Sequence, residues 1–118
     1  MVVGRRRPVA VLLLTTTVVS VKSGEPYDVY IGRANARYGL ARSPFANPYI
    51  IGRDGSRDDV IAKYRVYVQR CPDLLAAIPG LRGKVLGCWC ADVTSLTLLD
   101  VPYICHGQVI CAIADGVI

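Results

Sequence analysis

The run Val85-Leu86-Gly87-Cys88-Trp89-Cys90 predicts a short buried strand, around which the other elements can be arranged. It follows the polar, glycine-containing segment Leu81-Arg82-Gly83-Lys84, and an apolar run bounded by turn residues is typical of a strand inside a domain. Ligand sites in α/β proteins lie at the carboxyl ends of strands. The two cysteines that end this run are therefore predicted to belong to a site.

A helix is predicted directly upstream, from residue 57 to residue 70. Ser56 can cap it, and the spacing Ser56-x-x-Asp59 approximates a capping box. Cys71-Pro72 ends this helix and begins a short second one, from Asp73 to Ile78, which Pro79-Gly80 stops. The core face of the longer helix has apolar residues at helical spacing: Val60, Ile61, Tyr64, Tyr67 and Val68.

A third helix is predicted downstream, between Gly107 and Ala114. Val109, Ile110 and Ile113 recur at helical spacing, and Gly116 is a stop signal. Cys105 and His106 would then lie near the amino end of this helix, where backbone N–H groups stabilise a thiolate. The prediction brings the single histidine of the chain close to a cysteine.

The first thirty residues are predicted to form strands. Arg5-Arg6-Arg7 precedes an uncharged, mostly apolar run from Pro8 to Val21, which has the outline of an export signal but is rich in β-branched residues. As a helix this run would span about 21 Å, short of the roughly 30 Å membrane core, so no membrane association is predicted. Tyr27 to Gly32 is a second predicted strand, pairing with the first as a hairpin. Residues 1–16 are expected to be an N-terminal extension that forms a strand, and residues 17–118 a single domain.

Composition favours one folded domain with anionic partners. The chain has 118 residues, 53% apolar and 19% charged, which suffices for a hydrophobic core. A formal charge of +5 favours nucleotides or nucleic acid as partners. Five cysteines, an odd number, fit a reducing compartment and hence a cytoplasmic location. The predicted fold class is α/β, a single compact domain with a small mixed sheet and about three helices.

The cysteines and the histidine of the C-terminal half admit three interpretations. Cys88, Cys90, Cys105 and His106 together would supply a tetrahedral zinc site. Alternatively, Cys90 or Cys105 is a catalytic nucleophile, with His106 as its base or orienting group. In the third interpretation the cysteines are small buried hydrophobic residues and His106 makes only local hydrogen bonds.

An arginine- and glycine-rich segment forms the second candidate site. Guanidinium groups bind phosphate in a bidentate manner, and glycine lets backbone N–H groups approach the anion. Ser43, Asn47 and Tyr49 would add hydrogen bonds to a sugar or base. The alternative is a solvated charged face, and the lack of a Walker or Gly-x-Gly-x-x-Gly motif gives no indication of ATP hydrolysis or dinucleotide binding. The arginines in question are Arg33, Arg37, Arg42, Arg53 and Arg57, of which Arg33, Arg53 and Arg57 are the predicted phosphate ligands.

A series of ordered motifs runs from about Val18 to the end of the chain: Tyr30-Ile31-Gly32-Arg33, Ser43-Pro44-Phe45-Ala46-Asn47-Pro48-Tyr49, Ile51-Gly52-Arg53-Asp54-Gly55-Ser56-Arg57, Tyr64, Leu81-Arg82-Gly83-Lys84, Leu86-Gly87-Cys88-Trp89-Cys90 and Cys105-His106-Gly107. In these motifs the chain resembles the bacterial and bacteriophage domain-of-unknown-function family 4326. Family members usually join the Cys-Trp-Cys and Cys-His-Gly motifs by a few residues, whereas Ala91 to Ile104 is a longer connection here; they also carry an acidic residue where this chain has Gln108. The resemblance implies an architecture without an established activity.

Two functions are compatible with these features. The first is an enzyme acting on a nucleotide or nucleic-acid-derived substrate, with arginines holding phosphate and Cys90, Cys105 and His106 near the reacting atom. The second is a non-catalytic nucleic-acid-binding module, in which the cysteines and histidine hold a structural zinc or simply pack. Both require the two candidate sites to meet in space.

Overall fold

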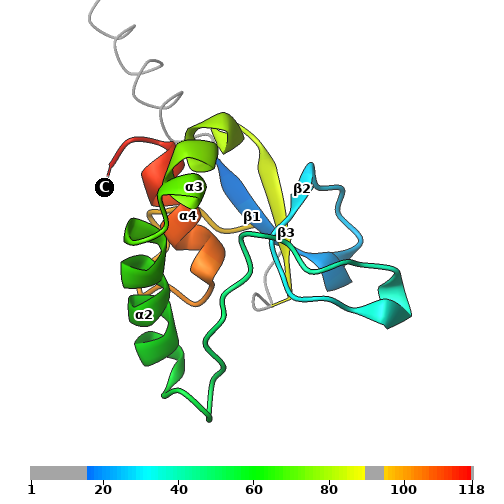
Figure 1. The fold of residues 1–118 in the computed structure, drawn as a ribbon. Helices are drawn as coiled ribbons and strands as arrows, with labels where there is room; N and C mark the ends of the chain where they lie inside the picture. Colours follow the sequence, from blue (N-terminus) through cyan, green and yellow to red (C-terminus); the bar gives the residue numbers. More distant parts are fainter. Residues whose placement is uncertain (1–15, 90–94, 118) are drawn as a thin grey trace, which may run out of the picture.

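The computed structural model describes residues 16–89 and 95–117, which form an α/β domain. Figure 1 shows the helices gathered on one side of the small sheet, with the loop that carries residues 33–56 running along the other side and beneath it. The predicted fold class, one compact α/β domain with a small sheet and three α-helices, is confirmed for these residues. Its elements are β1 (Thr17–Ser20), β2 (Val29–Tyr30), α2 (Arg57–Gln69), α3 (Pro72–Ala77), β3 (Val85–Cys88) and α4 (His106–Ala114), with 3-10 turns at Val21–Ser23, Ala36–Tyr38 and Ile78–Leu81.

The three strands of the described residues run parallel in the order β1-β3-β2. Val18 is paired with Leu86, and Tyr30 with Gly87, so β3 lies between the two strands that precede it in the chain. The predicted hairpin of the first two strands is therefore wrong. The described sheet is therefore parallel, where a mixed sheet was expected; the antiparallel pairing of β1 with Leu96 is an isolated bridge at Val18.

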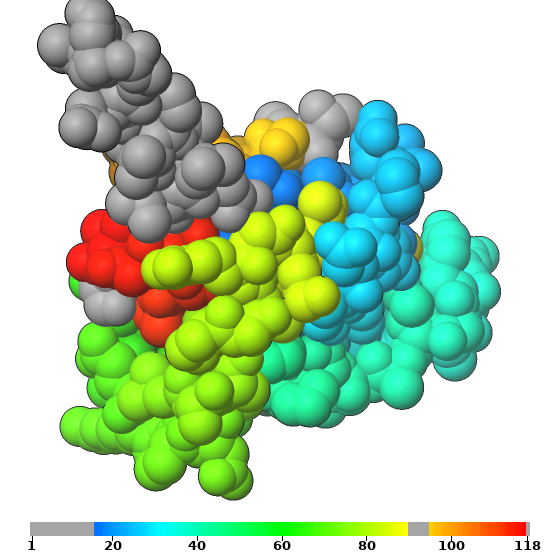
Figure 2. Space-filling view, turned by 90° about the horizontal axis from the view of Figure 1, so that it is seen from above, coloured from blue at the N-terminus to red at the C-terminus, as the bar shows by residue number. Residues whose placement is uncertain are grey.

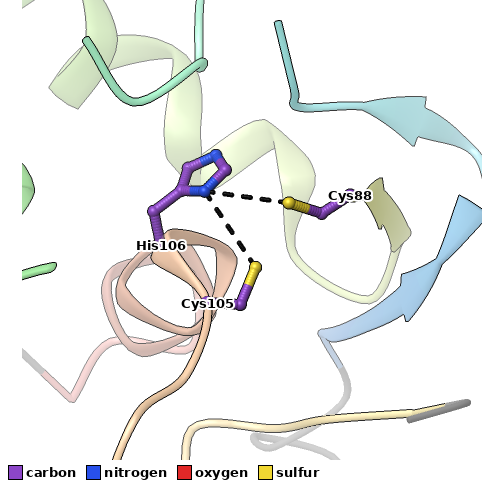
Figure 3. Close-up of side chains that lie close together, drawn as sticks. All are labelled: Cys88, Cys105 and His106. Atoms are coloured by element: carbon purple, nitrogen blue, oxygen red, sulfur yellow. Dashed lines mark hydrogen bonds between the residues drawn. The ribbon is translucent and has the colours of Figure 1, made fainter. Parts of the chain in front are cut away.

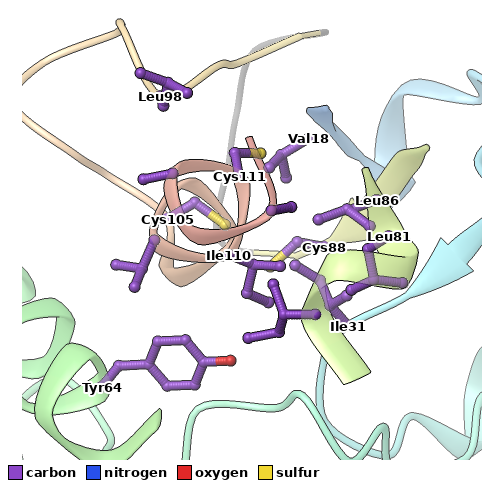
Figure 4. Packing of buried hydrophobic residues seen from close by; sticks show 14 of the residues in the cluster. Val18, Ile31, Tyr64, Leu81, Leu86, Cys88, Leu98, Cys105, Ile110 and Cys111 are labelled. Atoms are coloured by element: carbon purple, nitrogen blue, oxygen red, sulfur yellow. The ribbon is translucent and has the colours of Figure 1, made fainter. Parts of the chain in front are cut away.

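The core lies between the sheet and α4, as Figure 4 shows. Leu86 of β3 and Ile110 of α4 are fully buried, and α4 is buried on nearly all sides. A helix that is apolar all round belongs in the interior, whereas α2 buries one stripe and leaves its charged residues in water. That buried stripe consists of Val60, Ile61, Tyr64 and Val68, as predicted, while Tyr67 is half-buried.

The helix boundaries follow local signals. The Ser56 side chain accepts a hydrogen bond from the Asp59 backbone, and the Asp59 carboxylate accepts one from the Ser56 backbone, which confirms the predicted capping box. The second helix begins at Pro72, one residue earlier than predicted, since proline suits the first turn of a helix. The third begins at His106 with Cys105 as its cap, as the prediction of a helix start there required.

Two segments of the sequence predictions fall partly outside the described residues. The strand expected within residues 1–15 lies outside the described residues. Thr16 is buried, and its hydroxyl donates a 2.7 Å hydrogen bond to Asp115. Of the connection before α4, residues 95–104 contain no strand beyond the bridge at Leu96, and Val101 is 73% exposed. In the part of the chain that the structure describes, no helix is long and apolar enough to cross a membrane.

The surface seen from above in Figure 2 separates two regions of the domain. The helical region, green to red, lies on one side, and the segment of residues around 30–45, cyan to teal, projects on the other. Between them run the strands, with the carboxyl end of β3 at Cys88. The fold thereby brings the end of β3, the start of α4 and the arginine-rich loop into one neighbourhood.

Candidate metal and ligand site

Two elements bring three predicted metal ligands together. Cys88 is the last residue of β3, while Cys105 and His106 are the cap and first residue of α4. The Nδ1 atom of His106 lies 3.8 Å from the Cys88 sulfur and 4.0 Å from the Cys105 sulfur, as Figure 3 shows. All three ligand atoms lie within 4.8 Å of one another, and all three residues are buried. This group could hold a metal ion.

The hydrogen bond at the far side of the ring fixes the tautomer of His106. Its Nε2 atom lies 2.8 Å from the carbonyl oxygen of Ile31. A carbonyl oxygen only accepts hydrogen bonds, so Nε2 carries the proton and Nδ1 turns its lone pair toward the two sulfurs. Metal-binding histidines generally make this kind of bond with the nitrogen that faces away from the ion.

Burial keeps the imidazole of His106 neutral. It lowers the pKa of His106 to about 4, and the positive charge of Arg33 adds to this effect, while the bond to Ile31 opposes it. Neutral imidazole is the form that binds metals. A protonated imidazolium as partner of a thiolate, which cysteine nucleophiles often use, is disfavoured in the same surroundings.

The dimensions of the group fit a tetrahedral zinc site after a small contraction. Zinc lies about 2.3 Å from sulfur and about 2.0 Å from nitrogen, so tetrahedral ligand atoms are roughly 3.5 to 3.8 Å apart. The nitrogen-to-sulfur distance of 3.8 Å lies at the upper end of this range and that of 4.0 Å exceeds it, and the three ligand atoms together lie within 4.8 Å of one another. Cys105 is disulfide-bonded in this structure, so its use as a ligand requires reduction. Cys90, the fourth predicted ligand, lies outside the described residues.

The start of α4 also favours a negatively charged sulfur. The backbone N–H of Gly107 donates to the Cys105 sulfur at 3.3 Å, and the positive end of the helix dipole lies there. Both effects would stabilise a thiolate once Cys105 is reduced. Cys105 itself is fully buried.

A pocket of about 220 Å³ joins this group to the arginine-rich loop. Cys88 and His106 contribute to its wall, and so do Arg33 and Arg57, two of the predicted phosphate ligands. Cys105, although close to both wall residues, is not among the lining residues. The lining comprises Gly32, Arg33, Asn47, Tyr49, Ile50, Ile51, Arg57, Val60, Ile61, Cys88, Trp89, Ile104 and His106.

Backbone carbonyl groups hold both pocket arginines in place. A terminal nitrogen of Arg33 donates to the Tyr49 carbonyl at 2.9 Å, and one of Arg57 donates to the Ile104 carbonyl at 2.7 Å. Each bond uses only part of a guanidinium group, which carries five N–H donors. Among the described residues that line the pocket, two are arginines and none is aspartate or glutamate.

The other predicted ligand residues of the loop lie elsewhere or have structural partners. Arg53 forms a 2.8 Å ion pair with Asp54 and does not line the pocket. Ser43 is also outside the lining, and its hydroxyl accepts a hydrogen bond from Phe45. Asn47 does line the pocket, but its amide nitrogen donates to Val60 and its oxygen accepts from Tyr49.

The apolar part of the wall was less marked in the sequence. Trp89 is half-buried, lines the pocket and packs on Tyr38 with ring centres 4.8 Å apart. Its position just beyond the carboxyl end of β3 was the available signal. Ile104 comes from the connection before α4, and no local pattern marks it as a pocket residue.

Comparisons with known proteins place the chain in a family. It is similar to "Uncharacterized protein R718" of Acanthamoeba polyphaga mimivirus, with 36% identity over 85 residues that cover 70% of this chain and 63% of that protein. The chain thus spans less than two thirds of this relative, and none of the solved structures matches it significantly. The model of one protein family matches residues 19–116. The chain therefore belongs to the family described as "Domain of unknown function (DUF4326)".

Proposed function

We propose that this domain is an enzyme that acts on a nucleotide or nucleic-acid-derived substrate in the pocket, with zinc held in the pocket wall. One observation carries the proposal: Arg33 and Arg57 line the same pocket as Cys88 and His106. Cationic groups and metal-binding side chains in one small concavity are a common arrangement in enzymes that process phosphorylated compounds. A reducing compartment such as the cytoplasm would keep the cysteines available.

The arginines are proposed to bind the phosphate of the substrate. Arg33 and Arg57 are anchored through carbonyl groups and present guanidinium forks, which match phosphate oxygens in geometry and charge. No carboxylate of the described lining competes for Arg33. Asn47 is proposed to act by positioning, since its hydrogen bonds join the loop to α2. Arg53 and Ser43 were also predicted to bind the ligand, but neither lines the pocket, and the proposal gives them no role.

Zinc is proposed as the ion that Cys88, Cys105 and His106 bind when Cys105 is reduced, with Cys90 as a further predicted ligand. When bound, zinc would supply a Lewis acid for a substrate oxygen. The side chains of the domain have separate tasks. Ile31 orients His106 through its carbonyl group, and Trp89 with the neighbouring apolar residues keeps water from the wall that the metal ligands share.

A non-catalytic nucleic-acid-binding module with a structural zinc is the second candidate. It is favoured by the burial of all three metal ligands and by the absence, from the described lining, of a carboxylate that could act as a general base. Binding to nucleic acid would weaken steeply with added salt because counterions are released from the phosphates. Binding of a small substrate in the pocket would depend less on salt and more on single residues.

Metal analysis of reduced, purified protein tests the zinc site. We expect about one zinc per chain, lost in Cys88→Ser and in His106→Ala and retained in Cys71→Ser, which alters a free cysteine outside the group. Chelation should lower the melting temperature of the wild type and of Cys71→Ser. Reduced wild-type protein that is folded and free of metal would contradict the proposal.

Mass spectrometry of nucleotide mixtures tests catalysis. Incubation with reduced protein that has been supplied with zinc should convert at least one nucleotide or short oligonucleotide into a product. The rate should fall at least tenfold in Arg33→Gln and stay unchanged in Arg37→Gln, because Arg33 lines the pocket and Arg37 does not. Binding without any conversion would contradict catalysis and favour the second candidate.

A further inference from the structure

We infer that the pocket is built for a single mononucleotide carrying a terminal phosphate monoester, and not for an internal stretch of nucleic acid. This inference rests on the proposed function and specifies its substrate class. Three properties of the pocket carry it: its volume, the charge of its wall, and the aromatic side chains beside the arginines.

The volume argues for a small ligand. At about 220 Å³ the pocket is below the range of roughly 300 to 1,000 Å³ usual for sites that enclose drug-sized molecules. A dinucleotide cofactor or several nucleotides of a strand need more space than this. One phosphate with its sugar and part of a base matches the available volume.

The charge of the wall argues for a terminal phosphate. A phosphate monoester carries about −1.5 to −2 charges at neutral pH, whereas an internal phosphodiester carries one. Arg33 and Arg57 both line the pocket, and guanidinium groups bind phosphate oxygens in a bidentate manner. The ion pair between Arg53 and Asp54 in the described residues lies away from the lining. Arg33 has no carboxylate partner among these residues.

The aromatic side chains argue for a nucleoside behind the phosphate. The backbone carbonyl of Tyr49 accepts the hydrogen bond from Arg33, and Trp89 follows Cys88 at the end of β3. Both line the pocket together with Ile50 and Ile51, so its apolar part borders its cationic part. A free phosphate would leave this apolar part unused, while a base can stack on an aromatic ring.

Calorimetric titration of the reduced, full-length protein supplied with zinc tests the inference. The probes are nucleoside 5′-monophosphates with each of the four common bases, the corresponding nucleosides, inorganic phosphate, dinucleoside monophosphates without a terminal phosphate, and a single-stranded decanucleotide. At least one 5′-monophosphate should bind tenfold or more tightly than its nucleoside, than inorganic phosphate and than the dinucleoside. Arg33→Gln and Arg57→Gln should each weaken its binding at least tenfold, and Arg37→Gln should not.

The possible outcomes separate this inference from the proposed function. If the decanucleotide or dinucleoside binds as tightly as every monophosphate, the terminal-phosphate inference fails and the proposed function stands. If inorganic phosphate binds as tightly as the monophosphates, the inference that the pocket also binds the nucleoside fails. If Arg33→Gln weakens nucleosides and monophosphates equally, the arginine is not recognising phosphate. If none of the nucleotides, nucleosides or oligonucleotides binds, both the inference and the proposed function fail.

Discussion

The starts of α2 and α4 share one motif in opposite surroundings. Each helix begins with a capping box, and each gives its first residue, Arg57 or His106, to the pocket. The box of α2 pairs Ser56 with Asp59 at the exposed surface, whereas that of α4 pairs Cys105 with Gln108 in the interior. Figure 1 shows the two helices side by side.

The difference shows how one local motif serves two purposes. At the surface, the α2 box ends a loop and aligns an arginine with the pocket, and water can replace its hydrogen bonds. In the interior, the α4 box also holds the metal-capable group in place, and no water compensates for a lost partner. Changes at α4 should therefore cost more stability than matched changes at α2.

Replacing Gln108 with glutamate should have the largest effect. The amide nitrogen of Gln108 donates to the carbonyl groups of Thr97 at 3.0 Å and Asp100 at 2.7 Å, and the side chain is fully buried. A carboxylate has no donor for either carbonyl and is costly to bury. We expect Gln108→Glu to lower the free energy of unfolding by about 3 kcal/mol at pH 7, measured by urea denaturation.

The matched control is Gln69→Glu, which makes the same chemical change at an exposed position of α2. It should alter stability by no more than about 0.5 kcal/mol. The cost of Gln108→Glu should also shrink in acid, because a protonated glutamate regains one donor. Equal stabilities of the two variants at pH 7 would show that the α4 box does not hold the preceding connection.

Gln108 also explains a departure of this chain from the family pattern. The resemblance implied an acidic residue at this position and a shorter connection before Cys105-His106-Gly107. Here the amide oxygen accepts from the backbone of Ile104 and Cys105, and the amide nitrogen bonds to residues of the longer connection. An acidic side chain could make the first pair of bonds but not the second. The amide of Gln108 is therefore suited to the longer connection of this chain.

The two helix starts were not equally predictable from the sequence. Ser56-x-x-Asp59 is a pattern of preferred capping residues, so the start of α2 was predicted together with its box. The start of α4 was located, but its box was not, because cysteine is an unusual cap and Gln108 also bonds to Thr97 and Asp100 in the irregular connection before the helix. Local patterns indicate local hydrogen bonds and miss those that require tertiary structure.

Replacing Gly107 with alanine should have an intermediate effect. A Cβ atom at Gly107 would lie 2.7 Å from the Ile31 side chain and 2.8 Å from that of Val18, closer than real contacts allow. This overpacking should cost about 1 to 3 kcal/mol in the free energy of unfolding, although alanine favours a helix. The control is Gly80→Ala, where a Cβ meets nothing within 4 Å and stability should hardly change. A Gly107→Ala protein as stable as the control would mean that α4 moves easily against the sheet.

Long-range arrangement was the least predictable part of the fold and of the pocket. The hairpin was expected because the first two strands are close in the sequence, but packing inserts β3 between them. Among the five arginines of the loop region, no periodicity distinguishes Arg33 and Arg57 from the rest. Arg33 and Arg57 are held at the pocket by hydrogen bonds to the carbonyl groups of Tyr49 and Ile104, which the fold brings next to them.

Ser56→Ala should have the smallest effect and should show that the α2 box alone is sensitive to acid. Loss of the serine cap should cost about 1 kcal/mol.

Hydrogen bonds from the Ser56 backbone and hydroxyl lower the pKa of Asp59. The stability that this carboxylate contributes is therefore present above its unfolded pKa and is lost as the pH falls through its folded pKa. In Ser56→Ala the pKa of Asp59 should rise toward its ordinary value, which NMR titration of the carboxyl carbon would detect, with the exposed Ser95→Ala as control. Gln108 does not titrate, so the α4 box should show no counterpart. An unchanged pKa of Asp59 in Ser56→Ala would mean that the Ser56 side chain contributes nothing to the charge of the box.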